Sequence, residues 1–153
     1  MLRLFPLFFI LVIAASFSVE YPRYHKVPAL PGDGVFSLLR RYHLEQHSCN
    51  HIAFYKLNKL KKGSGLKVGR YYTIPVQLYQ FNGKTIRSSI GINDWDLAKT
   101  IESYNDNMLK DGFREISFKK NKILWVPHHF LNCPDEDIPF AEESNNNGES
   151  TIS

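Results

Sequence analysis

Two apolar segments that each contain a proline constrain the fold more than any other feature of this sequence. The first, LKVGRYYTIPVQLYQF (residues 66–81), alternates apolar and polar side chains as a strand does. The second, KKNKILWVPHHFL (residues 119–131), is an apolar run that predicts another strand. Pro75 and Pro127 interrupt these strands at similar positions, and proline in a sheet favours an edge strand or a bulge. The similar positions of the two prolines indicate an internal repeat in which the same kind of strand occurs twice.

Helical patterns precede the first of these strands. The segment YHKVPAL (24–30) predicts a short extended stretch, and Asp33 is a good N-cap for a helix in which apolar residues from Val35 to Tyr42 recur at helical spacing. A second helix is expected to begin near Ser48 or Asn50 and to end around 58–60, followed by a loop at KKGSG. The order is strand, helix, helix, strand.

The following residues repeat that order more loosely. KTIRSSIGI (84–92) predicts a strand, and Asp94 or Asn93 caps a helix that carries Trp95. The strand with Pro127 then closes the repeat. We therefore predict an α+β fold of two small modules, at residues 21–79 and 80–133.

The ends of the chain differ from this body. Residues 4–15 are apolar and are followed by small residues, which predicts a signal peptide at 1–18 and an exported protein of the periplasm or cell envelope with no membrane span after its removal. Residues 134–153 are acidic and polar, so we expect a disordered tail or linker.

Positive charge is concentrated between the two ends. Residues 19–134 contain 18 basic and nine acidic side chains, a net charge of +9, whereas six of the 15 acidic residues of the 153-residue chain lie in the tail. Such a body could attract an anionic polymer or could simply present a solvated surface. Export and the absence of a repeated basic-aromatic pattern argue against a nucleic-acid partner.

The chain has two cysteines, Cys49 and Cys133. In an oxidising compartment a disulfide between them is possible, and two buried free thiols fit the sequence equally well.

The first module resembles a LysM domain, a βααβ module that binds glycans containing N-acetylglucosamine, such as peptidoglycan. The likeness lies in YHKVPALPGDGVFSLLRRYHL (24–44), CNHIAFYKLNKL (49–60) and LKVGRYYTIP (66–75). Gly34 and Phe36 stand where the family usually has Thr and often has Trp. Residues 84–131 resemble a second, degenerate copy without the Gly-Asp turn.

This resemblance implies a glycan groove between two lips. The first lip is Gly32, Asp33, Gly34, Val35 and Phe36, where glycines let the backbone approach a ligand and the apolar side chains can contact an acetamido methyl. The second lip is the loop 58–66, with candidate residues Asn58, Leu60, Gly63 and Leu66. Read from the residues alone, the same turn could be only a helix cap, with Phe36 in the core.

The whole chain also resembles the leader region of exported bacterial N-acetylmuramoyl-L-alanine amidases. That likeness implies a non-catalytic peptidoglycan-binding module with no cofactor, which could carry a zinc amidase domain against the wall. The alternatives are a leader fragment whose amidase domain is missing from this chain, and an envelope module that binds another protein.

The sequence offers two candidate chemical sites, a zinc site and a thiol nucleophile. HLEQHSCNH (43–51) contains three histidines and one cysteine, all potential zinc ligands, but an expected helix junction would point them apart. A thiol nucleophile at Cys133 would sit between the end of a strand and the tail, a poor place to hold it rigidly. We therefore expect neither a metal site nor a catalytic centre.

Overall fold

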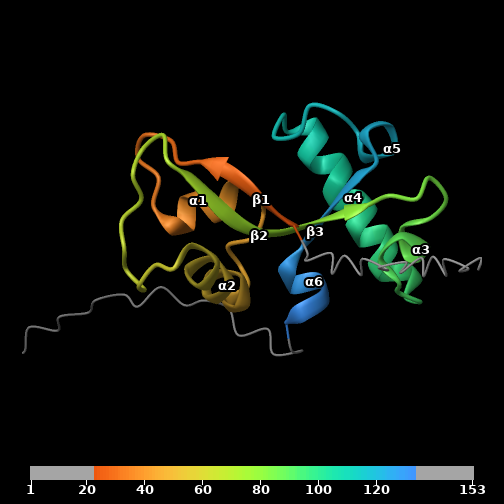
Figure 1. The fold of residues 1–153 in the computed structure, drawn as a ribbon, viewed down its shortest axis with the longest axis horizontal. Coiled ribbons are helices and arrows are strands. Elements are labelled where there is room, and N and C mark those ends of the chain that lie inside the picture. The colour runs from red at the N-terminus through yellow and green to blue at the C-terminus, as the bar shows by residue number, and fades with distance from the viewer. Residues whose placement is uncertain (1–22, 134–153) are drawn as a thin grey trace, which may run out of the picture.

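The computed structural model describes residues 23–133, which form a mixed α+β fold around a three-stranded antiparallel sheet (Figure 1). The signal peptide and acidic tail expected from the sequence lie outside these residues. The strands, in the sheet order β1-β2-β3, are β1 (Arg23–Pro28), β2 (Tyr71–Gln80) and β3 (Ile123–Pro127). The helices are α1 (Val35–Arg41), α2 (Ser48–Asn58), α3 (Ile86–Ile90), α4 (Trp95–Lys110), α5 (Phe118–Asn121) and α6 (His128–Asn132).

Strand β2 is central and belongs to two units. The first unit consists of β1, α1, α2 and β2, and the second consists of β2, α3, α4, α5 and β3. Figure 1 shows α1 and α2 around one end of β2, with α3, α4 and α5 around the other. The boundary that the sequence placed between residues 79 and 80 falls inside this shared strand.

The two strand pairs overlap on β2 just after Pro75. Strand β1 pairs with β2 over residues 71–73 and again at 77–78, while β3 pairs with β2 over residues 76–80. Between the two β1 pairings, residues 74–76 of β2 stand opposite the single residue His25, so the register is irregular there. A proline has no N–H to donate, and this irregularity accommodates it in a central strand.

The apolar side chains form two clusters. Helix α4 contributes to both, because Tyr104 and Met108 pack in the first cluster, whereas Ala98 and Ile101 pack in the second. The first cluster comprises Val27, Ala29, Val35, Leu38, Leu39, Tyr42, Leu44, Phe54, Tyr72, Ile74, Val76, Tyr104, Met108 and Trp125. The second comprises Phe81, Ile86, Ala98, Ile101, Phe118, Leu124 and Val126. The two units therefore pack on one another and do not form two independent domains.

Two secondary-structure predictions are wrong. KTIRSSIGI does not form a strand: Thr85 accepts a hydrogen bond from Ser88 N at 3.1 Å and caps helix α3, and Gly91 ends that helix at φ +73°. The strand expected to run through His128 stops at Pro127, and α6 begins at the next residue. By contrast, the predicted cap of α4 is confirmed, because Asp94 accepts from Leu97 N at 2.9 Å.

Candidate functional site

The first lip opens with a turn that Asp33 fastens. Its carboxylate accepts a hydrogen bond from Leu30 N at 2.7 Å and pairs with Arg41 Nη2 at 2.8 Å. Asp33 is therefore not the N-cap that the sequence predicted, because that position is Gly34. The φ of Gly32 is +84°, which a residue with a side chain rarely adopts.

The backbone at Gly34 is open to solvent. Ser37 Oγ accepts from Gly34 N at 2.9 Å and donates to Gly34 O at 3.1 Å, which holds the first turn of α1. A Cβ added at Gly34 would meet no atom within 4 Å. A ligand can thus approach this backbone, and a larger side chain can be placed there without a clash inside the protein.

The two apolar residues of the first lip have separate roles. Val35 is buried in the first cluster, whereas Phe36 is 40% exposed. The ring of Phe36 stacks on His51 at 6.1 Å between centroids, and the guanidinium of Arg40 lies 5.7 Å from its centroid. Phe36 is therefore an exposed aromatic surface held by its neighbours, and the interpretation of it as a core residue is wrong.

The second lip is anchored by Asn58. Its Oδ1 accepts from Thr73 N, and its Nδ2 donates to Thr73 O and to Phe54 O, each at 2.8 Å. Both polar atoms of this side chain are engaged inside the protein, so Asn58 positions the loop. Leu60 and Leu66 are half-buried against the first cluster, which also holds Val35, and Gly63 is exposed. The two lips therefore rest on one apolar core.

The second unit contains the same arrangement, an asparagine side chain that bonds to both backbone groups of one strand residue, and the sequence did not predict it. We call this arrangement an asparagine clasp. Asn105 Oδ1 accepts from Trp125 N at 3.0 Å, and its Nδ2 donates to Trp125 O and to Ile101 O at 2.8 Å. Thr73 and Trp125 each stand two residues before the proline of their strand. Each asparagine also bonds the carbonyl four residues earlier in its own helix. The sequence signal was an asparagine four residues after a buried apolar residue, Phe54 or Ile101.

Arg114 reinforces this second clasp. It is only 4% exposed, and its guanidinium donates to Asn105 Oδ1 at 2.7 Å and to Asn121 Oδ1 at 2.9 Å. It also lies over the ring of Trp125, 5.0 Å from the centroid. Burial lowers the pKa of Arg114, yet neutral acceptors satisfy its donors.

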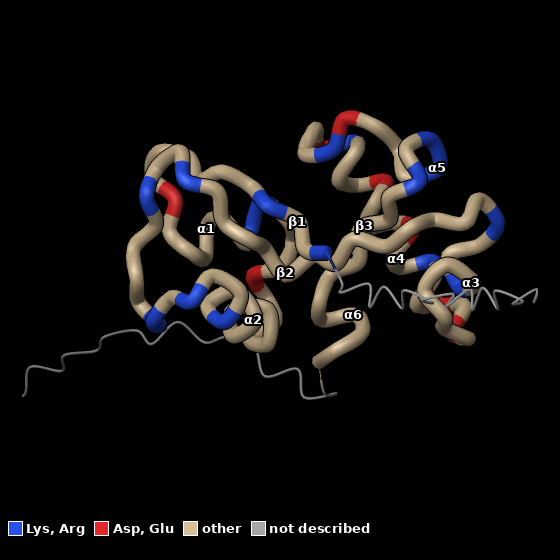
Figure 2. Tube along the Cα trace, in the orientation of Figure 1, with Lys and Arg blue, Asp and Glu red and all other residues tan. Residues whose placement is uncertain are grey.

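A hollow of about 250 Å³ lies in the second unit, where no ligand residue had been predicted. The end of β2, α3, α4 and α5 enclose it. Figure 2 places basic residues around the β2–α3 turn and on α3 and α5. The lining residues are Phe81, Lys84, Thr85, Ile86, Arg87, Trp95, Ala98, Lys99, Glu102, Phe118 and Lys119.

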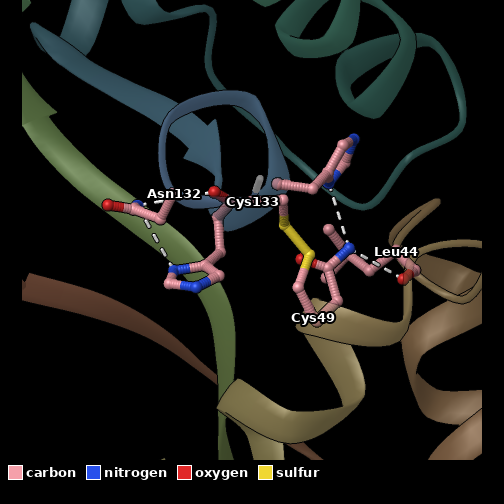
Figure 3. Close-up of a disulfide and its surroundings, with 7 residues drawn as sticks. Leu44, Cys49, Asn132 and Cys133 are labelled. Atoms are coloured by element: carbon pink, nitrogen blue, oxygen red, sulfur yellow. Dashed lines mark hydrogen bonds between the residues drawn. A yellow bond between two sulfur atoms is a disulfide. The ribbon is translucent and has the colours of Figure 1, made fainter. Parts of the chain in front are cut away.

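A disulfide between Cys49, at the start of α2, and Cys133, after α6, ties the end of the described chain to the first unit (Figure 3). The two Cα atoms are 6.0 Å apart. This is the pairing that the sequence left open, and it leaves neither sulfur as a thiol nucleophile.

Two half-buried histidines pack against rings from other segments of the chain. His129 of α6 stacks on His47 at 3.9 Å between centroids and pairs through Nδ1 with Asn50 Nδ2 at 3.0 Å. Burial, with His47 and His128 nearby, lowers the pKa of His129 to about 3. His25 of β1 lies 4.2 Å from the Trp125 ring, and burial with Arg114 nearby lowers its pKa to about 4. Both rings are neutral near pH 7.

Within residues 23–133, no three His, Cys, Asp or Glu side chains gather in a way that could hold a metal ion. No helix in that part of the chain is long and apolar enough to cross a bilayer. Comparison of the chain with models of known protein families, with curated proteins and with solved structures finds no match.

Proposed function

We propose that this protein is a non-catalytic binding protein for wall glycan that contains N-acetylglucosamine, acting at the cell envelope after export. This is the function implied by its resemblance to LysM domains. The strand-helix-helix-strand order of the first unit supports the proposal, as does the recurrence of the asparagine clasp in the second unit.

The first lip is the observation that carries the proposal. It combines open backbone at Gly34 with the exposed ring of Phe36. A pyranose ring has faces of C–H groups that pack on aromatic carbon. The exposed Phe36 ring, with no side chain at Gly34 to obstruct a ligand, suits such a neutral sugar.

Co-sedimentation with insoluble peptidoglycan tests this function. Gly34→Trp places an indole over the open backbone and should abolish binding, while its melting temperature stays near that of the wild type. Phe36→Ala should weaken binding about tenfold and cost less than about 1 kcal/mol of stability, because the ring is not in the core.

Phe113→Ala is the matched control, since Phe113 is an aromatic residue of similar exposure, 38%, in the second unit. It should sediment with the polymer as the wild type does. Soluble N-acetylglucosamine oligomers should compete with the polymer if the glycan is the ligand. A Gly34→Trp protein that melts normally and still sediments fully would rule out this lip as the binding surface.

A further inference from the structure

We propose that the hollow in the second unit is a separate binding site for a sugar ring that carries a carboxylate. The proposal goes beyond the glycan lip of the first unit and does not rest on it, because the two surfaces share no residue. It follows from three properties of the lining: an aromatic wall, an excess of positive charge and a volume that fits one ring.

The aromatic wall comes from three segments. The rings of Phe81 and Phe118 meet edge to face at 5.0 Å, and both side chains are buried. Trp95, the first residue of α4, is 60% exposed and presents its ring beside them. An exposed indole next to a buried aromatic pair offers an apolar plane on which the C–H face of a sugar can stack.

The charge of the lining is strongly positive. The lining contains four cationic side chains and one carboxylate, that of Glu102, so its net charge is +3. The cationic residues are Lys84, Arg87, Lys99 and Lys119. Lys119 pairs with Glu102 and Lys99 with Asp96, both at 2.8 Å, but these pairs are solvent-exposed and therefore weak. Asp96, outside the lining, offsets one of these charges, and a ligand carboxylate would offset another, which a neutral ligand cannot do.

Arg87 links the charge to the wall. Its guanidinium lies over the Trp95 ring at 5.1 Å from the centroid. Its Nε is buried and has no hydrogen-bond partner in residues 23–133. A guanidinium is suited to a carboxylate, which it can bind through two parallel hydrogen bonds. Because the Arg87 guanidinium lies over one face of the Trp95 indole, a sugar ring in the hollow would pack beside this pair with its carboxylate toward Arg87.

The volume limits the ligand to one ring. At about 250 Å³ the hollow is smaller than the roughly 300–1,000 Å³ of sites for drug-sized molecules. Ala98 on α4 has the smallest side chain of the lining. A single acidic pyranose, as a free sugar or as one residue of a chain, matches this size.

Isothermal titration of the oxidised protein with two sugars that differ only in one acidic group tests the site. N-acetylmuramic acid is N-acetylglucosamine with a lactyl ether that ends in a carboxylate. The acid should bind about tenfold more tightly than the neutral sugar, and sodium chloride should reduce the difference. Glucuronic acid and glucose form a second pair that tests whether any acidic pyranose suffices. Sodium acetate tests whether the carboxylate alone accounts for binding.

Variants assign the binding to the hollow. Arg87→Gln should remove most of the preference for the acid, and Trp95→Ala should weaken both sugars of a pair. Lys84→Gln, at an exposed residue, provides a second test of the charge should Arg87→Gln melt early. Arg70→Gln is the matched control, because Arg70 lies over the Tyr72 ring in the first unit, outside both lips and the hollow, and its titrations should equal those of the wild type.

Equal affinity for the acid and the neutral sugar would overturn the proposal, as would an acid preference that survives both Arg87→Gln and Lys84→Gln. Acetate that binds as tightly as the acidic sugars would show an anion site without a sugar site. Titrations repeated in the Gly34→Trp variant, in which binding at the first lip is lost, report on the hollow alone, so failure here is distinguishable from failure of the first lip.

Discussion

The two units fasten their strands in the same way but present different surfaces. In each unit an asparagine side chain bonds to the backbone N–H and C=O of one strand residue, where a neighbouring strand would otherwise pair. These strand residues are Thr73 in β2 and Trp125 in β3. The second residue of the first helix, by contrast, is Phe36 in one unit and Arg87 in the other. The apolar lip suits a neutral ligand and the cationic hollow an acidic one. The asparagine hydrogen bonds that hold the strands therefore involve other residues than Phe36 and Arg87, the side chains that would determine ligand specificity.

The clasps themselves differ in depth. Asn58 is half-buried and bonds only to backbone atoms, whereas Asn105 is 2% exposed and also accepts from Arg114. Water can replace the lost partner of a half-buried group more readily than that of a buried one. The second unit therefore depends more heavily on its clasp than the first.

The largest expected effect is on the disulfide that links α2 to the end of α6. Replacing both Cys49 and Cys133 with Ser opens a loop with a sequence separation of 84 residues. The chain-entropy model predicts a loss of about 4–5 kcal/mol in the free energy of unfolding. Urea denaturation of the double variant, beside oxidised and reduced wild type, measures it. A loss below about 1 kcal/mol would mean that packing alone holds α6 on α2.

The next effect compares the two clasps directly. Asn105→Ala leaves Trp125 N–H, Trp125 C=O and Arg114 without a partner and should cost about 3–4 kcal/mol. Asn58→Ala should cost about 1–2 kcal/mol, because water reaches Thr73. Asn107→Ala, an exposed residue on the same helix as Asn105, serves as the control in thermal and urea unfolding. Equal losses for the two clasps would refute the difference in depth.

The smallest effect, taken per pH unit, is the loss of stability in acid. The unfolded histidines titrate near pH 6.5, whereas His25 and His129 in the folded protein stay neutral down to about pH 4 and pH 3. As the pH falls below 6.5, the unfolded state takes up protons that the folded state does not, so stability decreases; above 6.5 neither group contributes. The slope is at most about 1.4 kcal/mol per pH unit for each proton.

His129→Gln should reduce that slope in urea denaturation between pH 7 and pH 4, since one contributing group is gone while His25 and His128, whose pKa burial also lowers, remain. A slope that is unchanged in this variant would show that His129 already takes up its proton in the folded protein. A slope that vanishes would mean that His25 and His128 contribute nothing.

The sequence predicted most elements because local signals determine them. The cap at Asp94, the extent of α2 and the irregularity at Pro75 depend on residues close together in the chain. Helix α3 was mistaken for a strand because Ile86 and Ile90 fit a short strand in KTIRSSIGI as well as a helix. Over so few residues, apolar spacing does not separate the two structures, and the hydroxyl of Thr85 decides.

The sites were less predictable than the elements. The residues of the first lip are continuous in sequence, so a family resemblance could point to them. The hollow gathers side chains from four segments between Phe81 and Lys119, and only the packing of α3, α4 and α5 brings them together. The predicted role of Asp33 as an N-cap is wrong because its carboxylate pairs instead with Arg41, at the far end of α1.

The position of the disulfide has a mechanical consequence. Tension applied to Arg23 and Cys133 would pass from Cys49 straight to Cys133, so the segment between the two cysteines carries no load while the bond is intact. Only the chain from Arg23 to Cys49 could extend, to a length of roughly 90 Å at full stretch. A pull on both ends would thus strip β1 and α1 from the protein, while β2, β3 and the walls of the hollow stay inside an unstretched covalent ring.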